Sequence, residues 1–382
     1  MADVRLASRM NHIEGSGVRR MFDLIRTMED PINLSIGQAD YDAPEPVKEA
    51  AIEAIRGGLN RYTVTEGRPA LNAAIADRLE QRYGHRPESV FMTSGVSGGL
   101  LLSHLALLDP GDEVLLPDPY FVMYKNVLAL VGAVPRYYDL YPPVDAGDGR
   151  RPWHPDLGQL EREITDRTRV ILLNSPSNPT GGMLTGAELD QIGEIARRHD
   201  AWIFSDEIYS HFVYDDAMQS MITRMPRYSR ILVFGGFSKT FGVPGWRLGF
   251  VAGPTDVLEA MKLLQQYTFV CAPAPLQQGA LAALELDMSA TRDAYRRKRD
   301  RVFEVLSSAY KLVPSEGSFY AFPEYPAGME EASFIAACLE QKLLVVPGSA
   351  FSRRATHFRI SFAASDAMLE RGLEVLRDIA GT

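Results

Sequence analysis

The chain has 382 residues, of which 40 are Lys or Arg and 49 are Asp or Glu, so its formal net charge is −9. Its composition, 46% hydrophobic and 23% charged, is typical of a globular protein with a large core and excludes the disordered, collagen-like and disulfide-rich classes. The acidic balance, without a dense run of basic residues, argues against nucleic-acid or anionic-membrane partners, which bind to a basic face.

Cysteine usage and the N-terminus predict a cytoplasmic protein. Cys271 and Cys338 lie in unrelated contexts, so we expect no disulfide framework, and a reducing compartment fits. Residues 1–10 carry charges and lack the apolar stretch of a signal peptide. No run approaches the roughly 18 apolar residues of a membrane span, so we expect neither export nor a membrane partner.

Between about residues 89 and 253, short apolar runs alternate with helical periodicity, which predicts an α/β domain. The run from Val170 to Leu173 is apolar throughout, as expected for a mostly parallel sheet that helices cover on both faces. Thr185 and Glu188 form a capping-box pattern ahead of a helix. The predicted strands are 89–93, 113–117, 134–138, 170–174, 201–205, 231–234 and 248–252.

After Pro275 the pattern changes to long charged helices, notably 289–309, with short strands expected at 318–322, 343–346 and 358–362. This pattern predicts a second, smaller α+β domain, and a chain of this length exceeds the usual size of a single core. We predict three parts, which are an N-terminal segment (1–45) joining the small domain, a large domain (46–280) and a small C-terminal domain (281–382).

Polar side chains follow two predicted strands, and the carboxyl ends of strands in an α/β sheet open onto its ligand crevice. Lys239 follows the strand at 231–234, where a desolvated amine can form a Schiff base with a carbonyl. Asp206 and Tyr209 follow the strand at 201–205, where the carboxylate can hold a heterocyclic nitrogen protonated. Each residue alone also fits an ordinary surface or packing role.

Two further segments are suited to a ligand. The polar stretch 174–182 contains two prolines and two glycines, and it presents the side-chain amides of Asn174 and Asn178. The turn at residues 95–97 leads into an apolar helix, and backbone amides at such a helix start can cradle a phosphate.

The same turn supports an alternative, a serine hydrolase. Ser97 occupies the nucleophile position of a Gly-x-Ser-x-Gly pattern, with Asp206 and His357 following in a suitable order, but no HGGG-type oxyanion segment is present. An NTPase loop does not fit, because no glycine directly precedes Lys239. The seven histidines show no spacing typical of ligands, so no metal site is predicted.

Together these segments resemble the fold type I pyridoxal-phosphate enzymes, specifically the class I/II aminotransferases, from about residue 32 to the C-terminus. The resemblance rests on the order of Gly95 to Ser97, Pro119-Tyr120-Phe121, Asn178-Pro179-Thr180-Gly181, Asp206-x-x-Tyr209, Ser238-Lys239, Arg247 and Phe358-Arg359-Ile360-Ser361. It implies the three-layer large domain of that fold with a mostly parallel sheet, a smaller α+β domain, and pyridoxal 5'-phosphate as cofactor.

The resemblance implies roles around the cofactor. Lys239 forms the internal aldimine, Asp206 pairs with the protonated pyridine nitrogen, and Tyr209 and Asn178 bond the phenolic oxygen. Phe121 is expected to stack on the pyridine face. The implied phosphate cradle comprises the amides of Gly95, Val96 and Ser97, the Ser238 hydroxyl and Arg247.

For the substrate, the resemblance implies that Arg359 grips the α-carboxylate, with Gly37 and Asn178 beside it. Tyr62 matches a tyrosine that reaches the phosphate in the partner subunit's site, which implies a homodimer with shared active sites. Two departures stand out. Gly236 replaces a frequent phosphate-binding serine, and Ser97 replaces a lysine that binds the distal carboxylate in aspartate-selective members.

The expected activity is amino transfer from a neutral, aromatic or hydrophobic L-amino acid to a 2-oxo acid, 2-oxoglutarate, by a ping-pong mechanism through the Lys239 aldimine. The missing lysine, together with Val18, Phe121 and Tyr124, favours aromatic donors. A C–S β-lyase of the cystathionine or cysteine-conjugate type remains the alternative, because it shares nearly every residue above. A transcription-regulator sensor does not fit, since the resemblance begins by residue 32 and leaves no room for a winged-helix module.

Overall fold

We describe a computed structural model of the protein, which covers residues 6–13, 15, 17, 25–26, 28–141, 153–224 and 228–381. A seven-stranded sheet with the order β2-β8-β7-β6-β5-β3-β4 forms its centre. Only β8 runs antiparallel to its neighbours, so the expectation of a mostly parallel sheet is confirmed. The strands are β2 (Ser89–Ser94), β3 (Glu113–Asp118), β4 (Val134–Asp139), β5 (Thr168–Asn174), β6 (Trp202–Asp206), β7 (Ile231–Gly236) and β8 (Leu248–Gly253).

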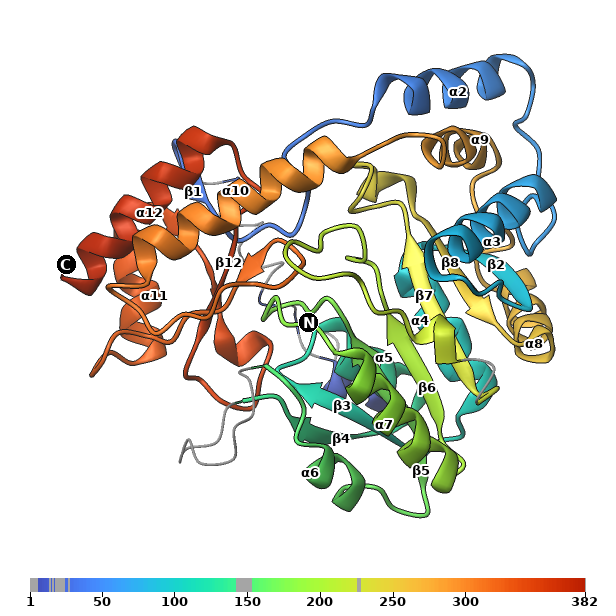
Figure 1. Ribbon diagram of the computed structural model, residues 1–382, viewed down its shortest axis with the longest axis horizontal. Coiled ribbons are helices and arrows are strands. Elements are labelled where there is room, and N and C mark those ends of the chain that lie inside the picture. Colours follow the sequence, from blue (N-terminus) through green and yellow to red (C-terminus); the bar gives the residue numbers. More distant parts are fainter. Residues whose placement is uncertain are drawn as a thin grey trace.

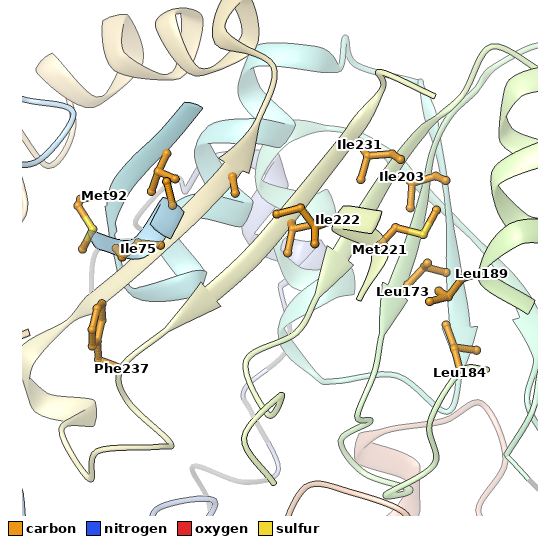
Figure 2. Packing of buried hydrophobic residues seen from close by; sticks show 14 of the residues in the cluster. Ile75, Met92, Leu173, Leu184, Leu189, Ile203, Met221, Ile222, Ile231 and Phe237 are labelled. Carbon is orange, nitrogen blue, oxygen red and sulfur yellow. The ribbon is translucent and has the colours of Figure 1, made fainter. Parts of the chain in front are cut away.

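Alternate residues of β5 enter two separate cores, because successive side chains of a strand point to opposite faces. Ile171 and Leu173 pack with one set of helices, and Val170 and Leu172 with the other. Figure 2 shows the first of these cores. The first set is α3 (Pro69–Tyr83), α6 (Leu157–Arg162), α7 (Gly186–Arg198) and α9 (Ala274–Ala283), and the second is α4 (Gly95–Leu107), α5 (Met123–Val131) and α8 (Thr255–Gln266). The three-layer prediction is therefore confirmed.

The predicted capping box starts α7. Glu188 N donates to the Thr185 hydroxyl at 3.2 Å, and Thr185 N donates to the Glu188 carboxylate at 2.7 Å. This reciprocal pair satisfies two backbone donors that a helix start leaves free.

The C-terminal helices gather beside the large sheet, in orange and red in Figure 1. They enclose a third core with three short strands and with β1 (Ile32–Asn33), which pairs in parallel with β10 (Leu343–Leu344). The helices are α10 (Ser289–Leu306), α11 (Glu331–Glu340) and α12 (Asp366–Ala380), and the three strands, ordered β11-β12-β9, are β9 (Tyr320–Ala321), β11 (Val346–Pro347) and β12 (Phe358–Ser361). The remaining elements are α2 (Glu45–Arg56), which packs on α9, and the short helices η1 (Ser8–His12), η2 (Met221–Arg224), η3 (Pro244–Trp246) and η4 (Gly348–Ala350).

The predicted strand 343–346 is wrong as one element. Its first half pairs with β1 and its second half with β12, so it forms two strands in different sheets. The helix expected to reach residue 309 ends at Leu306. The domain boundaries at 45 and 280 stay predictions. Within the described ranges, no helix is long and apolar enough to cross a membrane, and no three His, Cys, Asp or Glu side chains are grouped to hold a metal.

Candidate active site

A cavity of about 330 Å³ lies where the carboxyl ends of β5, β6 and β7 meet the start of α4. Eleven of the predicted site residues line it, namely Gly37, Val96, Ser97, Phe121, Asn178, Asp206, Tyr209, Ser238, Lys239, Arg247 and Arg359. Its wall also contains residues that were not predicted as site residues, including Ile36, Gln38, Val122, Met123 and Tyr320. The structure therefore brings segments from the whole length of the chain to one place.

Lys239 follows β7, and its Nζ donates a 2.6 Å hydrogen bond to the Gly37 carbonyl. Burial and the nearby Arg359 cation lower the pKa of this amine to about 8, while the Asp206 charge opposes that shift. An amine with such a pKa is partly neutral near pH 8, which is the form needed to attack a carbonyl carbon.

Asp206 ends β6 with its side chain fully enclosed. The Tyr124 hydroxyl donates to Oδ2 at 2.9 Å, and the amide of Ile208 donates to Oδ1 at 3.2 Å. Burial raises the pKa of Asp206 to about 6, and the bond from Tyr124 and the Lys239 charge hold it below the value that burial alone would give. The carboxylate is thus positioned to accept one further donor from the cavity.

Arg359 on β12 is 1% exposed, and its guanidinium lies between the rings of Tyr320 and Phe351, 4.4 and 4.6 Å from their centroids. It donates to Asn178 Oδ1 at 2.8 Å and to the Ser35 carbonyl at 2.6 Å. In the part of the chain that the structure describes, no carboxylate forms an ion pair with it. A buried cation without a counter-charge is a site for an anion.

The bond from Arg359 fixes the orientation of Asn178, because a guanidinium can only donate. The Asn178 amide nitrogen consequently faces the Tyr209 hydroxyl, at 3.4 Å. Tyr209 also lies 2.8 Å from the Tyr320 hydroxyl. Asn178 and Tyr209, which are predicted to bind the cofactor's phenolic oxygen, are thus linked to Arg359, which is predicted to bind the α-carboxylate.

The start of α4 has the features of a phosphate site. The N-cap Ser94 makes no side-chain capping bond, which leaves the amides of Val96 and Ser97 for a ligand. The Gly95 amide donates to the Arg247 carbonyl at 3.1 Å, which contradicts its predicted part in the phosphate cradle. Gly95 has φ 67°, and a Cβ there would lie 2.6 Å from Arg247 Nη2. A Cβ on Gly249 would lie 2.5 Å from Val96 N, so two glycines allow Arg247 and β8 to approach this turn.

The charges and spaces of the cavity fit pyridoxal 5'-phosphate. A partly neutral amine can meet its aldehyde, a buried carboxylate its ring nitrogen, and an uncapped helix start with Arg247 its phosphate. Lys239, Asp206 and Arg247 provide these three groups at one cavity.

Several other predicted residues lie outside the cavity or make contacts that differ from those predicted. Tyr62 does not line the cavity and is 84% exposed, and Val18 lies outside the described residues. The hydrolase triad is wrong, since within the described contacts His357 pairs with Thr356 and stacks on Phe322 rather than meeting Ser97. Gly37 is needed for packing, because a Cβ there would lie 2.2 Å from the Tyr320 hydroxyl.

Two tyrosines of the site were missed or misread. Tyr320 belongs to no motif, and the sequence marks it only as an aromatic residue on a short predicted strand. Tyr124 was assigned to donor preference, whereas its hydroxyl binds Asp206. Phe121 lies in the turn before α5 and Tyr124 on its first turn, so helical spacing gave no signal for the contact between the two rings.

Comparisons with known proteins identify the family of the chain. Residues 29–376 match the family described as aminotransferase class I and II. Similar proteins include the putative aminotransferase YugH of Bacillus subtilis (35% identity, 96% of each chain) and aromatic-amino-acid aminotransferase 2 of Thermococcus litoralis (33%, 98% of each). The solved aspartate aminotransferase of Thermus thermophilus with maleate is similar with a TM-score of 0.91 at 31% identity, over 99% of this chain and 100% of that one. The chain belongs to the class I and II aminotransferases, which use pyridoxal phosphate, and it is a transaminase.

Proposed function

We propose that the protein transfers an amino group from a neutral L-amino acid, aromatic or hydrophobic, to 2-oxoglutarate. The observation that carries this proposal is the number of cationic side chains that line the cavity. Among the described residues, those lining the cavity are Lys239, Arg247 and Arg359. Each has a task in the proposal, at the cofactor's aldehyde, its phosphate and the α-carboxylate, so none of these three is left for the distal carboxylate of an aspartate donor.

The apolar side chains that line the cavity also favour a neutral amino donor. Ile36, Val122, Met123 and Phe121 line the cavity, and burying an aromatic or branched donor side chain against them is favourable by about 25 cal/mol per Å². Ser97, at the position where the family resemblance implies a lysine in aspartate-selective members, contributes a neutral hydroxyl. Val18, assigned to the same preference, stays a prediction.

The proposed roles at the cofactor follow from the contacts above. Pyridoxal phosphate, when bound, supplies an electron sink that stabilises negative charge at the substrate Cα. Asp206 would bind its ring nitrogen, Tyr209 and Asn178 its phenolic oxygen, and Phe121 its ring face. The amides of Val96 and Ser97, with Ser238 and Arg247, would hold its phosphate.

Lys239 would also move the proton. With a pKa of about 8, its Nζ is partly neutral near pH 8, so it could accept the proton from the substrate Cα and return it. Arg359 would hold the α-carboxylate, which orients the Cα–H bond toward that amine.

We propose 2-oxoglutarate as the acceptor in a second half-reaction of a ping-pong cycle. Its distal carboxylate finds no further cation among this chain's described residues at the cavity, and the Gln38 amide and the Ser97 hydroxyl, which line the cavity, are neutral donors available to it. The named relatives are aminotransferases, which favours transfer over C–S β-lysis.

A donor screen tests the proposal. Phenylalanine, leucine and aspartate are each supplied with 2-oxoglutarate or pyruvate, and initial rates are measured over both substrate concentrations. We expect parallel double-reciprocal lines and a kcat/KM for phenylalanine at least ten times that for aspartate, which corresponds to about 1.4 kcal/mol. A higher kcat/KM for aspartate would overturn the donor assignment.

We further propose a cytoplasmic homodimer. Large apolar side chains are exposed at Tyr62, Val64, Tyr267 and Phe269, with Tyr62 and Tyr267 more than four-fifths exposed. Such side chains are typical of a surface that a partner subunit covers. Tyr62 would then reach the phosphate bound by the other subunit, and sedimentation analysis would detect the dimer.

A further inference from the structure

Tyr124 connects two groups that the proposed function places against the cofactor ring. Its side chain is 1% exposed, and its hydroxyl donates to Asp206 Oδ2 at 2.9 Å. Its ring meets the Phe121 ring edge-on, with the centroids 5.7 Å apart and an interplanar angle of 80°. One side chain therefore contacts both the acid expected at the ring nitrogen and the aromatic ring expected on the ring face.

The Tyr124 phenol is the donor in its hydrogen bond with Asp206. Burial, and after it the Asp206 charge, raises the pKa of Tyr124 well above its ordinary value, so Tyr124 stays a protonated donor. A donor to the carboxylate favours its charged form. The second oxygen, Oδ1, accepts from the Ile208 amide, so the carboxylate is held by two donors from two elements.

Other titratable groups also face Asp206. Lys239, after β7, lowers its pKa through charge, and Tyr209, in the turn after β6, interacts with it electrostatically. Lys239 reacts in the proposed function and so cannot serve as a constant counter-charge. The Tyr124 hydroxyl, by contrast, takes no part in the proposed reaction.

We propose that Tyr124 is a positioning residue, which holds the Asp206 carboxylate charged and aimed into the cavity while its ring sets the plane of Phe121. This inference rests on the proposed pairing of Asp206 with the ring nitrogen of pyridoxal phosphate. It differs from a packing role, because it requires the hydroxyl and not only the ring.

The test uses Tyr124→Phe, with Tyr138→Phe as matched control and Asp206→Asn as reference. Tyr138 is an equally buried tyrosine whose hydroxyl donates to the Leu172 carbonyl at 3.0 Å. The carboxyl infrared band of Asp206 is followed against pH in the protein without cofactor, and the dissociation constant of pyridoxal phosphate is measured by titration of its absorbance.

We expect Tyr124→Phe to raise the pKa of Asp206 by roughly one to two units and to weaken pyridoxal phosphate binding about tenfold, with neither change in Tyr138→Phe. An unchanged pKa of Asp206 in Tyr124→Phe, or an equal shift in both variants, would overturn the inference. If Asp206→Asn binds the cofactor with native affinity and absorbance, the proposed pairing itself fails. These results separate failure of this inference from failure of the proposed function.

Discussion

The Lys239 ammonium donates a 2.6 Å hydrogen bond to the carbonyl of Gly37, a residue 202 positions earlier in the chain. The contact is possible because β1 pairs with β10 and brings the segment after it over the end of the large sheet. The N-terminal segment is consequently part of the site wall, next to both Lys239 and Tyr320.

Gly37→Ala should impair the site through Tyr320. The new Cβ would lie 2.2 Å from the Tyr320 hydroxyl but 3.2 Å from the ring carbon that bears it, so the hydroxyl is the main obstacle. We expect kcat/KM to fall at least tenfold in Gly37→Ala, and to fall much less when the same change is made in Tyr320→Phe. A double-mutant cycle on kcat/KM measures the coupling, and strictly additive effects would show that the clash does not control the loss.

Lys239→Met should change the pH dependence of stability of the protein without cofactor. The pKa of Lys239 is about 8 in the folded chain and ordinarily 10.5, so the folded state binds fewer protons between these values. The free energy of unfolding of the native chain therefore gains a contribution as pH rises from 8 to 10.5. We expect Lys239→Met to be more stable than the native chain by about 2 kcal/mol at pH 7, with the difference shrinking as pH rises.

Urea unfolding at pH 7 and pH 9.5 checks this expectation. Lys311→Met, at an 83% exposed lysine side chain, is the control and should give the same difference from the native chain at both pH values. A pH-independent difference for Lys239→Met would contradict the lowered pKa of its amine.

Arg359→Lys should damage recognition of the α-carboxylate although the positive charge is kept. A guanidinium binds a carboxylate through two parallel donors, and it also holds Asn178 and the Ser35 carbonyl, which one ammonium group cannot reproduce. We expect kcat/KM for the amino donor to fall about 100-fold, equivalent to roughly 3 kcal/mol. The control is Arg371→Lys, an exposed arginine paired with Asp30. Unchanged kinetics in Arg359→Lys would contradict the assignment.

Shared active sites can be tested with mixed dimers of Tyr62→Ala and Lys239→Ala. If Tyr62 serves the neighbouring site, one of the two sites in each mixed dimer combines an intact Tyr62 with an intact Lys239. Mixing should then restore a site with native affinity for pyridoxal phosphate, whereas neither parent has one. Failure to restore it in verified mixed dimers would show that Tyr62 serves its own chain or no site.

Much of the large sheet could be predicted from the sequence, because buried strands such as Val170 to Leu173 have a local signature. The strand-end positions of Asp206 and Lys239 followed from the same pattern, as did the choice of Asn178 as a ligand-facing amide. The family resemblance then gave the roles of Asn178, Arg247 and Arg359. Tyr124 and Tyr320 could not be assigned in this way. Their importance depends on long-range hydroxyl contacts with Asp206 and Tyr209, which no local spacing encodes. The division of 343–346 between two sheets likewise depends on tertiary pairing.

The most direct test of the account is covalent capture at Lys239. The purified protein is incubated with pyridoxal 5'-phosphate, reduced with borohydride, digested and analysed by mass spectrometry, with Lys239→Arg treated in parallel. We predict one phosphopyridoxyl group on the peptide that contains Lys239, and none on that peptide in the variant. A native protein that binds the cofactor but carries the group on other lysines, with Lys239 unmodified, would contradict the account.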